Sequence, residues 1–425
     1  MNRLNLKIIK SEYFKSIYNQ AILVFIAQLI PVIFSPLIAR LYDENAIAEI
    51  TGLISLSSIL IVFSSLKIEN AIVLAKDDKI AKEIIFLTLT LSLIYFVIML
   101  GVTYVFRNEI TDIFKIDNII NFVPFYILSF SLLNILNFWF VRLKKFKLKA
   151  YSKVLENLSY IVFALILYFF IGDNQYGLAA GKIIGVFLAF FILFKYSTLN
   201  IKRVSLKRLK ELLIIYKEFP LFNAPSNFFN TIGLQLLVLF IGGYFSKDNF
   251  GYFGLANMII LLPISFVSKS VGSIFFQKIT ENYNLGNFIE VKKTLFETLS
   301  LLLAIAVPIF VILFFWAEEI FSLVFGDNWI VSGKIAKYLS FVFLFQLTIS
   351  PIGISLIAIN KVKINSYWQY GRFLFLAIVM YITLNKFEVG FLNFIKIYSF
   401  SVSFVYLIYF IIILYQINQL DISKH

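Results

Sequence analysis

Cysteine is absent from this chain of 425 residues, and the only histidine is its last residue, His425. A chain without cysteine forms no disulfides and offers no thiolate as a nucleophile or as a metal ligand. A single terminal histidine also argues against histidine-based acid–base chemistry and against zinc sites. We therefore expect no metal and no cofactor, and the classes of enzyme that depend on these groups are disfavoured.

Charged residues are scarce as well, at 15% of the chain, whereas apolar residues make up 60% and the mean hydropathy is +0.88. These values are typical of a membrane protein and lie far from those of an ordinary soluble domain. The chain has 38 lysines and arginines against 24 acidic residues, which gives a net charge of +14. The basic residues lie beside apolar stretches, so the excess indicates membrane orientation, and we expect no nucleic-acid partner.

The apolar residues form twelve runs that are each long enough to cross a bilayer as a helix, which takes roughly 20 residues. The first six runs fall at residues 17–39, 47–75, 83–105, 119–141, 154–171 and 175–194. The other six fall at residues 219–243, 250–276, 294–316, 334–358, 364–385 and 389–416. The sequence therefore predicts an all-α polytopic membrane protein with about 12 transmembrane helices.

The distribution of lysine and arginine predicts the orientation of these helices. When the segments between the runs are assigned alternately to the two sides, most basic residues fall on the side that holds both termini. The opposite side carries only Arg40, Arg107, Lys115, Lys247, Lys334, Lys337 and Lys386, where Lys334 and Lys337 are counted with the loop although they lie in the first turn of the run at 334–358. Because basic loops stay in the cytoplasm, both termini are predicted to be cytoplasmic.

A basic segment between the sixth and seventh runs divides the chain into halves. Residues 201–218 of this segment repeat apolar residues at helical spacing with lysines between them. This pattern predicts a cytoplasmic amphipathic linker helix on the inner leaflet, although a solvated linker could have the same composition. Residues 1–200 and 219–425 would then form an N-terminal and a C-terminal six-helix lobe.

Residues that are rare in this chain recur between the two halves. At an offset of 202 residues, Gly52 aligns with Gly254 and Lys67 aligns with Lys269, with no gap between them. Six helices return the chain to the same side of the membrane, so both halves would share one topology. The repeat predicts two pseudo-symmetric lobes around a central cavity, an architecture that is typical of transporters.

Five basic residues are predicted inside the spans, where a charge at the bilayer centre costs about 2.5–3.5 kcal/mol. They are Lys67, Lys182, Lys269, Arg372 and Lys396. Each long side chain could instead extend its charge to the membrane interface, and this reading suits Lys396 best. We predict that Lys67, Lys182, Lys269 and Arg372 line the cavity and bind an anionic substrate that carries phosphate or pyrophosphate.

Acidic residues inside the spans include Glu69, Glu156 and, near the start of the ninth run, Glu297. Glu69 and Glu156 could either couple transport to an ion or form interhelix ion pairs. Residues two apart on an α-helix point about 200° apart, so Lys67 and Glu69 are not expected to pair with each other. The nucleotide-binding signature GxxxxGK[ST] does not occur in the chain. A proton or Na⁺ gradient is therefore the predicted energy source.

Three stretches resemble the O-antigen and capsular polysaccharide flippases, a branch of the multidrug, oligosaccharidyl-lipid and polysaccharide exporter (MOP) superfamily. Residues 36–78 are similar to the opening of that family, with Lys67 and Glu69 at its basic-x-Glu element. Residues 216–230, YKEFPLFNAPSNFFN, are similar to the start of its seventh span, and residues 324–356 contain its FGxxW…G…SP element.

The resemblance implies a MATE-like bundle of two lobes in the bacterial inner membrane. Such a flippase would move an undecaprenyl-pyrophosphate-linked oligosaccharide, such as an O-antigen or capsule repeat unit, from the cytoplasmic to the periplasmic leaflet by alternating access. Its partners would be this substrate, membrane lipid and possible assembly partners, a polysaccharide polymerase and a chain-length regulator. It would be a transporter and not an enzyme.

Three other functions remain open at this point. A multidrug or organic-cation antiporter of the same superfamily would share the fold, but its cavity should carry acidic rather than basic residues. A membrane glycosyltransferase or polymerase would need acid or base residues in a sizeable loop, and the predicted outer loops are short. A purely structural scaffold would not account for the charges inside the spans.

Overall fold

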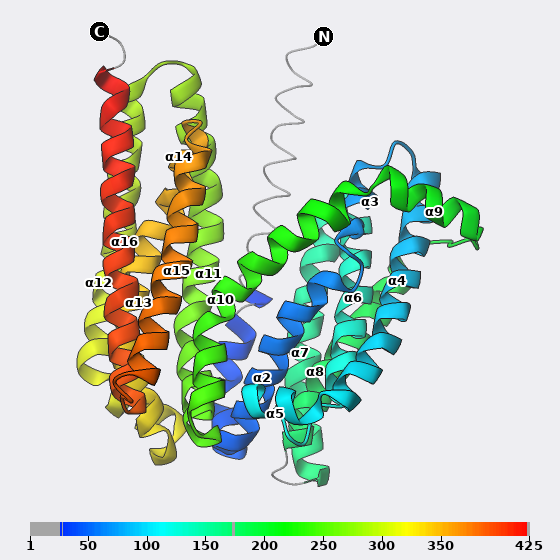
Figure 1. Ribbon diagram of the computed structural model, residues 1–425, viewed down its shortest axis with the longest axis horizontal. Helices are drawn as coiled ribbons and strands as arrows, with labels where there is room; N and C mark the ends of the chain where they lie inside the picture. Colours follow the sequence, from blue (N-terminus) through cyan, green and yellow to red (C-terminus); the bar gives the residue numbers. More distant parts are fainter. Residues whose placement is uncertain (1–25, 28, 172–174, 423–425) are drawn as a thin grey trace. The chain divides into compact units, whose positions relative to one another are not determined.

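The computed structural model describes residues 26–27, 29–171 and 175–422, apart from the side chains of a few helical residues that include Lys269. All regular structure in these residues is helical (Figure 1). The chain divides into two compact units, residues 1–251 and 252–425. Nine helices of the described residues are long and apolar enough to cross a membrane. These observations confirm the predicted all-α membrane fold.

The nine helices overlap nine of the predicted runs, although the helix at the second run ends at Phe63 and not at residue 75. The remaining three runs fall on the shorter apolar helix Leu29–Leu41 and on two long helices, α11 (Lys247–Asn284) and α15 (Val362–Asn385). Residues 17–25 of the first run lie outside the described residues. The predicted lobes, with a linker at residues 201–218 between them, remain a prediction. The first compact unit continues beyond that linker because the helix that follows it packs against helices near the start of the chain.

The first unit contains a series of helices that is interrupted early. In chain order after Leu29–Leu41 these are α2 (Glu44–Leu60), η1 (Ile61–Phe63), η2 (Ile68–Asn70), α3 (Ala71–Leu74), α4 (Asp78–Val105), α5 (Arg107–Phe114), α6 (Phe122–Arg142), α7 (Phe146–Ile171), α8 (Gln175–Tyr196), α9 (Leu206–Ile215), η3 (Phe219–Asn223) and α10 (Ala224–Tyr244). Asp43 caps α2, since its side chain accepts a hydrogen bond from the backbone N–H of Ala46 at 2.7 Å. Asp77 caps α4 in the same way, through the N–H of Ile80. Each helix thus begins where a carboxylate satisfies one of its free N–H groups.

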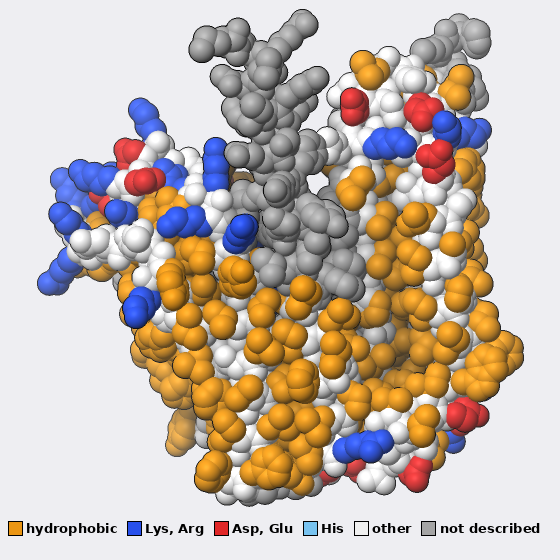
Figure 2. All heavy atoms as spheres, turned by 180° about the vertical axis from the view of Figure 1, so that it is seen from behind, with side chains coloured by type: hydrophobic (Ala, Val, Ile, Leu, Met, Phe, Trp, Pro, Cys, Tyr) orange, Lys and Arg blue, Asp and Glu red, His pale blue; other side chains and the backbone are white. Residues whose placement is uncertain are grey.

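The lateral surface of the helices is apolar. On α4, exposed side chains follow one another at helical spacing: Leu93, Ile94, Val97 and Ile98. Figure 2 shows hydrophobic side chains over the middle of the surface, while lysines and arginines gather at the end of the first unit that holds α9. A continuous apolar surface of this kind has no counterpart on soluble proteins and fits contact with lipid.

Arg142, at the end of α6, holds the turn between α3 and α4. Its Nη1 donates to the carbonyl oxygens of Ile72 and Ala75 at 3.1 and 2.7 Å, and its Nε pairs with the Asp78 carboxylate at 2.8 Å. A guanidinium offers several donors in a fixed plane, whereas an ammonium is a single point. One arginine therefore donates hydrogen bonds to two free carbonyls at the end of α3 and also forms an ion pair with the first acidic residue of α4.

The first prediction concerns this arginine. Arg142→Lys is expected to lower the stability of the protein by about 1–3 kcal/mol, because at least one carbonyl loses a charged donor. The measurement is the midpoint of thermal unfolding in detergent, with Lys145→Gln, an exposed position three residues further on, as the control. Equal midpoints for the two variants would show that the turn does not depend on the guanidinium.

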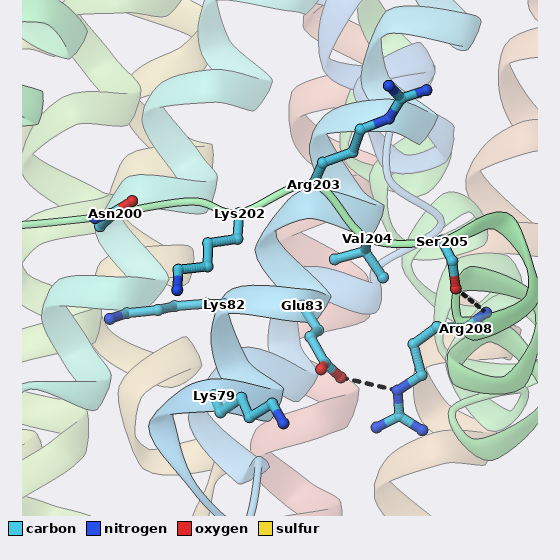
Figure 3. A pocket seen from close by; sticks show the side chains of 9 residues that line it. All are labelled: Lys79, Lys82, Glu83, Asn200, Lys202, Arg203, Val204, Ser205 and Arg208. Atoms are coloured by element: carbon cyan, nitrogen blue, oxygen red, sulfur yellow. Dashed lines mark hydrogen bonds and ion pairs between the residues drawn. The ribbon is translucent and has the colours of Figure 1, made fainter.

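The helix α9 lies within the segment predicted as an amphipathic linker. The Ser205 side chain caps it by accepting from the N–H of Arg208 (Figure 3). Leu209 and Leu212 are buried and α9 packs against α4, while Leu206 and Ile214 are exposed. One apolar face of α9 is therefore used inside the unit, and other apolar side chains remain at its surface.

The second unit consists of long helices. They are most of α11, then α12 (Phe288–Phe325), η4 (Asp327–Trp329), α13 (Ile330–Gly353), α14 (Ser355–Ala358), α15 and α16 (Phe391–Ile422). The helix α13 packs between α12 and α16. At 38 residues, α11 and α12 are each about 57 Å long, which exceeds the hydrocarbon thickness of a bilayer. Both helices therefore extend beyond the predicted spans.

Candidate functional site

The chain is not a single helix across the predicted run 47–75. The helix α2 tightens into the 3₁₀ turn η1 and ends at Phe63, and the next helical turn starts at Ile68. Between them Leu66 and Lys67 adopt left-handed conformations, with φ of 54° and 60°. That conformation costs a residue with a side chain roughly 1–2 kcal/mol. The break is therefore a strained backbone feature inside an apolar segment.

The break brings Lys67 and Glu69 together. The Lys67 Nζ lies 3.8 Å from Oε1 of Glu69, so the prediction that these residues would not pair is wrong. The angle of about 200° applies to a continuous α-helix, and the left-handed residue at position 67 turns the chain back on itself. Glu69 thus finds its cation two residues away in the same turn.

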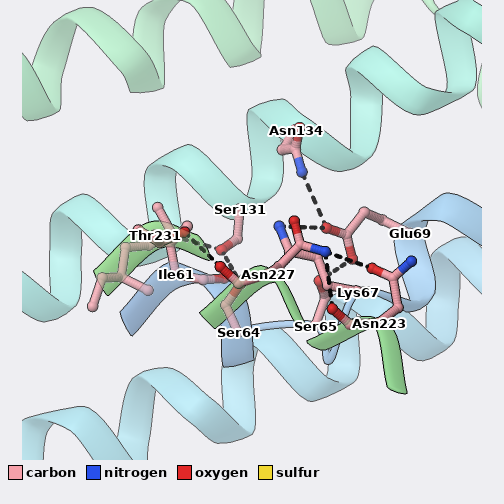
Figure 4. A network of polar contacts seen from close by, with 11 residues as sticks. Ile61, Ser64, Ser65, Lys67, Glu69, Ser131, Asn134, Asn223, Asn227 and Thr231 are labelled. Carbon is pink, nitrogen blue, oxygen red and sulfur yellow. Dashed lines mark hydrogen bonds and ion pairs between the residues drawn. The ribbon is translucent and has the colours of Figure 1, made fainter. Parts of the chain in front are cut away.

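Uncharged polar groups complete the surroundings of Glu69, whose side chain is only 4% exposed. The Ser65 hydroxyl donates to one carboxylate oxygen, and Nδ2 of Asn134 on α6 donates to the other at 3.3 Å. Figure 4 shows two asparagines of the segment that begins α10, Asn223 and Asn227, beside this pair; they are joined by a hydrogen bond of 2.8 Å. The Ser65 hydroxyl and the Asn134 amide thereby provide polar contacts that a buried carboxylate requires.

A second buried carboxylate, Glu156 on α7, has two cations. The Nζ atoms of Lys153 and Lys182 lie 2.7 and 3.2 Å from its two oxygens, and the Lys182 ammonium also lies over the Tyr160 ring at 5.1 Å. Close packing of α8 on α7 permits this contact: a Cβ added at Gly185 would lie 2.7 Å from the backbone nitrogen of Tyr160. Glu156 therefore pairs with a residue of the neighbouring helix, and a part in ion coupling stays a prediction.

Positive charge exceeds negative charge in this cluster, because two ammonium groups share one carboxylate. Lys182 is 12% exposed and is enclosed by α7 and α8, whereas the Lys153 side chain is 47% exposed. We refer to Lys153, Glu156 and Lys182 as the three-charge cluster. It carries a net positive charge, and Lys153 is the member that an incoming group could reach.

One face of α6 connects the two sites. The Lys153 ammonium lies over the Phe130 ring at 5.8 Å, and Asn134, four residues later on the same face, contacts Glu69. Four helical residues correspond to a rise of about 6 Å. The polar groups around Glu69 and the three-charge cluster are therefore neighbours inside the first unit, and they form the candidate functional site.

A third buried carboxylate, Glu49 on α2, lies elsewhere in the first unit. It is fully buried and pairs with Lys247, which also lies 3.3 Å from the Asp117 carboxylate. Asn118 donates to the same Glu49 oxygen at 2.9 Å. These residues come from α2, from the loop before α6 and from the start of α11, so the cluster joins segments that are distant in sequence. We interpret it as structural.

The other predicted cations are placed differently. Arg372 lies in the second unit, where its Nη1 donates to the Tyr406 hydroxyl at 3.1 Å and its guanidinium lies over the Trp368 ring at 5.1 Å. Among the charged groups that the structure describes, no carboxylate pairs with Arg372. Lys396 is exposed. The side chain of Lys269 lies outside the described residues, although its backbone is within α11, unlike the break at Lys67.

Sequence reasoning missed four residues of the candidate site: Lys153, Asn134, Asn223 and Asn227. The predicted run begins at residue 154 and leaves Lys153 outside the span, whereas α7 begins at Phe146. Its spacing of three residues from Glu156 is the signal that indicates it, since such residues face each other on a helix. The asparagines carry no charge, so the pattern of charges inside the spans does not indicate them.

Chemically, the candidate site can hold an anion but lacks the groups of a metal centre. The described residues contain no cluster of three or more acidic, histidine or cysteine side chains that could hold a metal ion. The site instead offers ammonium groups, amides and hydroxyls within an apolar helical unit. Such groups can replace the water around a charged or hydroxylated group that enters the membrane.

A family model described as polysaccharide biosynthesis protein matches residues 62–334. Among curated proteins, the teichuronic acid biosynthesis protein TuaB of Bacillus subtilis (strain 168) is 21% identical over 163 residues, which are 38% of this chain and 33% of TuaB. The chain spans less than half of the length of the curated relatives that it matches.

Solved structures agree on the fold. The lipid II flippase MurJ in an inward closed conformation has a TM-score of 0.70 at 17% identity, covering 96% of this chain and 87% of MurJ. An inward-facing multidrug resistance MATE family transporter of the MOP superfamily has a TM-score of 0.67 at 16% identity, covering 96% of both chains. These similarities confirm the predicted MATE-like fold.

Proposed function

Because the chain belongs to the polysaccharide biosynthesis protein family, we propose that it is a flippase for a lipid-linked oligosaccharide. The substrate would be an undecaprenyl-pyrophosphate-linked repeat unit of an O-antigen, capsule or related polymer, moved from the cytoplasmic to the periplasmic leaflet of the inner membrane. The termini would lie in the cytoplasm. A polymerase and a chain-length regulator would act on the delivered repeat unit.

The observation that carries this proposal is the three-charge cluster. A pyrophosphate is an anion that must lose water in order to enter an apolar unit, and burying charge without a partner is costly. Lys153 is half-exposed and already shares its carboxylate with Lys182, so the arrival of a phosphate supplies the missing negative charge. The amides and hydroxyls around Glu69 could then bind the hydroxyl groups of a sugar.

We propose distinct parts for the four predicted cations and for Lys153, which is not among them. Lys182 holds Glu156 in place, while Lys153 and Lys67 meet the substrate in the first unit. Arg372 and Lys269 would contribute from the second unit. Glu69 and Glu156 are the proposed carriers in coupling to a proton or Na⁺ gradient. A cavity for organic cations would need an acidic excess, and the cluster around Glu156 has the opposite balance.

The test of the function is direct. Cells that lack the gene are expected to accumulate lipid-linked oligosaccharide on the cytoplasmic leaflet, and proteoliposomes with the purified chain are expected to expose that lipid on the opposite leaflet. An organic cation serves as the rival substrate in the same vesicles. Export of the cation without movement of the oligosaccharide would favour the multidrug antiporter and refute the flippase.

The second prediction concerns Lys153. Lys153→Gln is expected to slow oligosaccharide movement by about tenfold or more, since a charge pair at 4 Å is worth roughly 4 kcal/mol before desolvation at an effective dielectric constant of 20. The measurement is the initial rate in proteoliposomes at matched protein content. Lys147→Gln, which removes an exposed lysine from the first turns of the same helix, is the control. Equal rates for both variants would remove Lys153 from the substrate path.

A further inference from the structure

A cavity of about 590 Å³ lies at the surface of the first unit, and none of the residues that line it belongs to the candidate site. It is bounded by the first turns of α4, by the chain between α8 and α9, and by the start of α9 (Figure 3). Basic side chains dominate its lining: Lys79, Lys82, Lys202, Arg203 and Arg208, with Glu83 as the acidic member. This is the end of the unit that the charge distribution predicts to be cytoplasmic.

The single carboxylate of the cavity is already neutralised. Nε of Arg208 lies 2.9 Å from Glu83, and its Nη1 lies 3.1 Å from Glu211. The hydrogen bonds that Arg208 donates to Glu83 and to Glu211 raise the pKa of its guanidinium, so this group is committed to its carboxylates. Arg203 also lines the cavity, but Figure 3 shows its side chain pointing away from Lys82 and Lys202. The lysines therefore supply the positive charge on their side of the cavity.

Lys82 and Lys202 are the lysines that the fold brings together. Figure 3 shows their ammonium groups next to each other, one from α4 and one from the chain before α9, with Lys79 one turn below on α4. None of the three pairs with a carboxylate among the groups that the structure describes. Two adjacent ammonium groups repel each other, and an anion between them removes that repulsion.

The cavity lies at a depth that fits lipid headgroups. The cavity is lined by residues at the start of α4, where the apolar span begins, and Leu206, directly after the lining residue Ser205, is 78% exposed. An exposed leucine beside unpaired lysines fits a ligand with both an anionic and an apolar part. Basic pockets at the cytoplasmic ends of transmembrane helices suit anionic headgroups.

We propose that this cavity binds a phosphate group, and specifically the phosphodiester of an anionic phospholipid of the inner leaflet. Lys82 and Lys202 contact the phosphate oxygens, and the acyl chains lie along the apolar surface of α4. Free inorganic phosphate shares the recognised chemistry but has no apolar part. The cavity shares no lining residue with the candidate functional site, so lipid binding can be tested without the transported substrate.

The test uses the purified full chain in detergent, titrated with phosphatidylglycerol and, separately, with phosphatidylcholine, with bound lipids counted by native mass spectrometry. Lys82→Gln/Lys202→Gln is expected to weaken phosphatidylglycerol binding by roughly 10- to 30-fold, since each lysine near a membrane surface contributes about 1 kcal/mol. Lys207→Gln/Lys210→Gln removes two exposed lysines of α9 that do not line the cavity, and it should bind as the unmodified protein does.

Each outcome decides the proposal. Weaker binding in the cavity variant alone, with phosphatidylcholine bound poorly by all proteins, supports the lipid site. If millimolar inorganic phosphate displaces the lipid and is itself retained by the protein as well as the lipid is, the cavity is a phosphate site whose ligand is the free ion. Unchanged phosphatidylglycerol binding in the cavity variant overturns both versions. If the double variant is not recovered folded, Lys202→Gln in the chain before α9 gives the same comparison.

Discussion

Replacing Glu156 with glutamine is expected to destabilise the protein by about 3–5 kcal/mol, because removal of one partner leaves a buried charge uncompensated. Lys182 accounts for most of this effect, since it is 12% exposed and lies between α7 and α8. Lys153 can turn toward water and contributes less. The measurement is the fraction of protein that stays monodisperse after heating in detergent, together with the yield from membranes.

Two further variants distinguish the effect of breaking the ion pair from the effect of removing any carboxylate. Glu109→Gln removes an exposed carboxylate on α5 and should change stability little. The double variant Glu156→Gln/Lys182→Gln removes both buried charges and should recover part of the lost stability. If the double variant is as unstable as Glu156→Gln alone, Lys182 is not the group that needs the carboxylate.

The second large effect is expected at two adjacent glycines of α10. A Cβ added at Gly242 would lie 2.1 Å from the backbone oxygen of Ile113 on α5, whereas a Cβ at Gly243 would meet no atom within 4 Å. Gly242→Ala is therefore expected to cost about 1–3 kcal/mol or more through overpacking against backbone that cannot rotate away. Gly243→Ala should be neutral or stabilise by up to about 1 kcal/mol, the propensity difference in a helix.

The comparison is well controlled, since the two variants make the same chemical change at neighbouring positions. The thermal unfolding midpoint of each variant is measured beside that of the unmodified protein. A lower midpoint for Gly243→Ala than for Gly242→Ala would mean that α5 and α10 do not approach closely. Transport by the two variants is also informative, because a wider separation of these helices should alter a conformational cycle.

Much of the fold could be predicted because long apolar runs have few structural solutions in a membrane. The runs at 83–105 and 119–141 lie within a few residues of α4 and α6. The break after Phe63 was not predicted, since residues 61–75 contain neither proline nor glycine. The polar residues of that stretch, such as Ser64 and Ser65, are its only sign of a break. In a continuous helix these side chains would face lipid.

The candidate site was predicted in part. Glu156 and Lys182 were both identified as buried charges, but their partnership depends on how α8 packs against α7, which the sequence of either helix alone does not specify. The pairing of Lys67 with Glu69 was predicted wrongly, because the angular argument assumed helical backbone at a position where φ is positive. Lys153 was missed because run boundaries follow hydropathy, while a helix can continue into polar residues.

The end of α2 at the break affects the electrostatic potential around Lys67 and Glu69 through the helix dipole. A helix carries roughly half a negative charge at its C-terminal end, and α2 with η1 ends four residues before Lys67. That partial charge and the Glu69 carboxylate together exceed the single charge of Lys67, so this part of the site is weakly negative. The three-charge cluster beyond Phe130 is positive. The first unit thus contains a local field along α6. For the proposed lipid-linked oligosaccharide, this field would draw the phosphate toward Lys153 and leave the uncharged sugar beside Glu69.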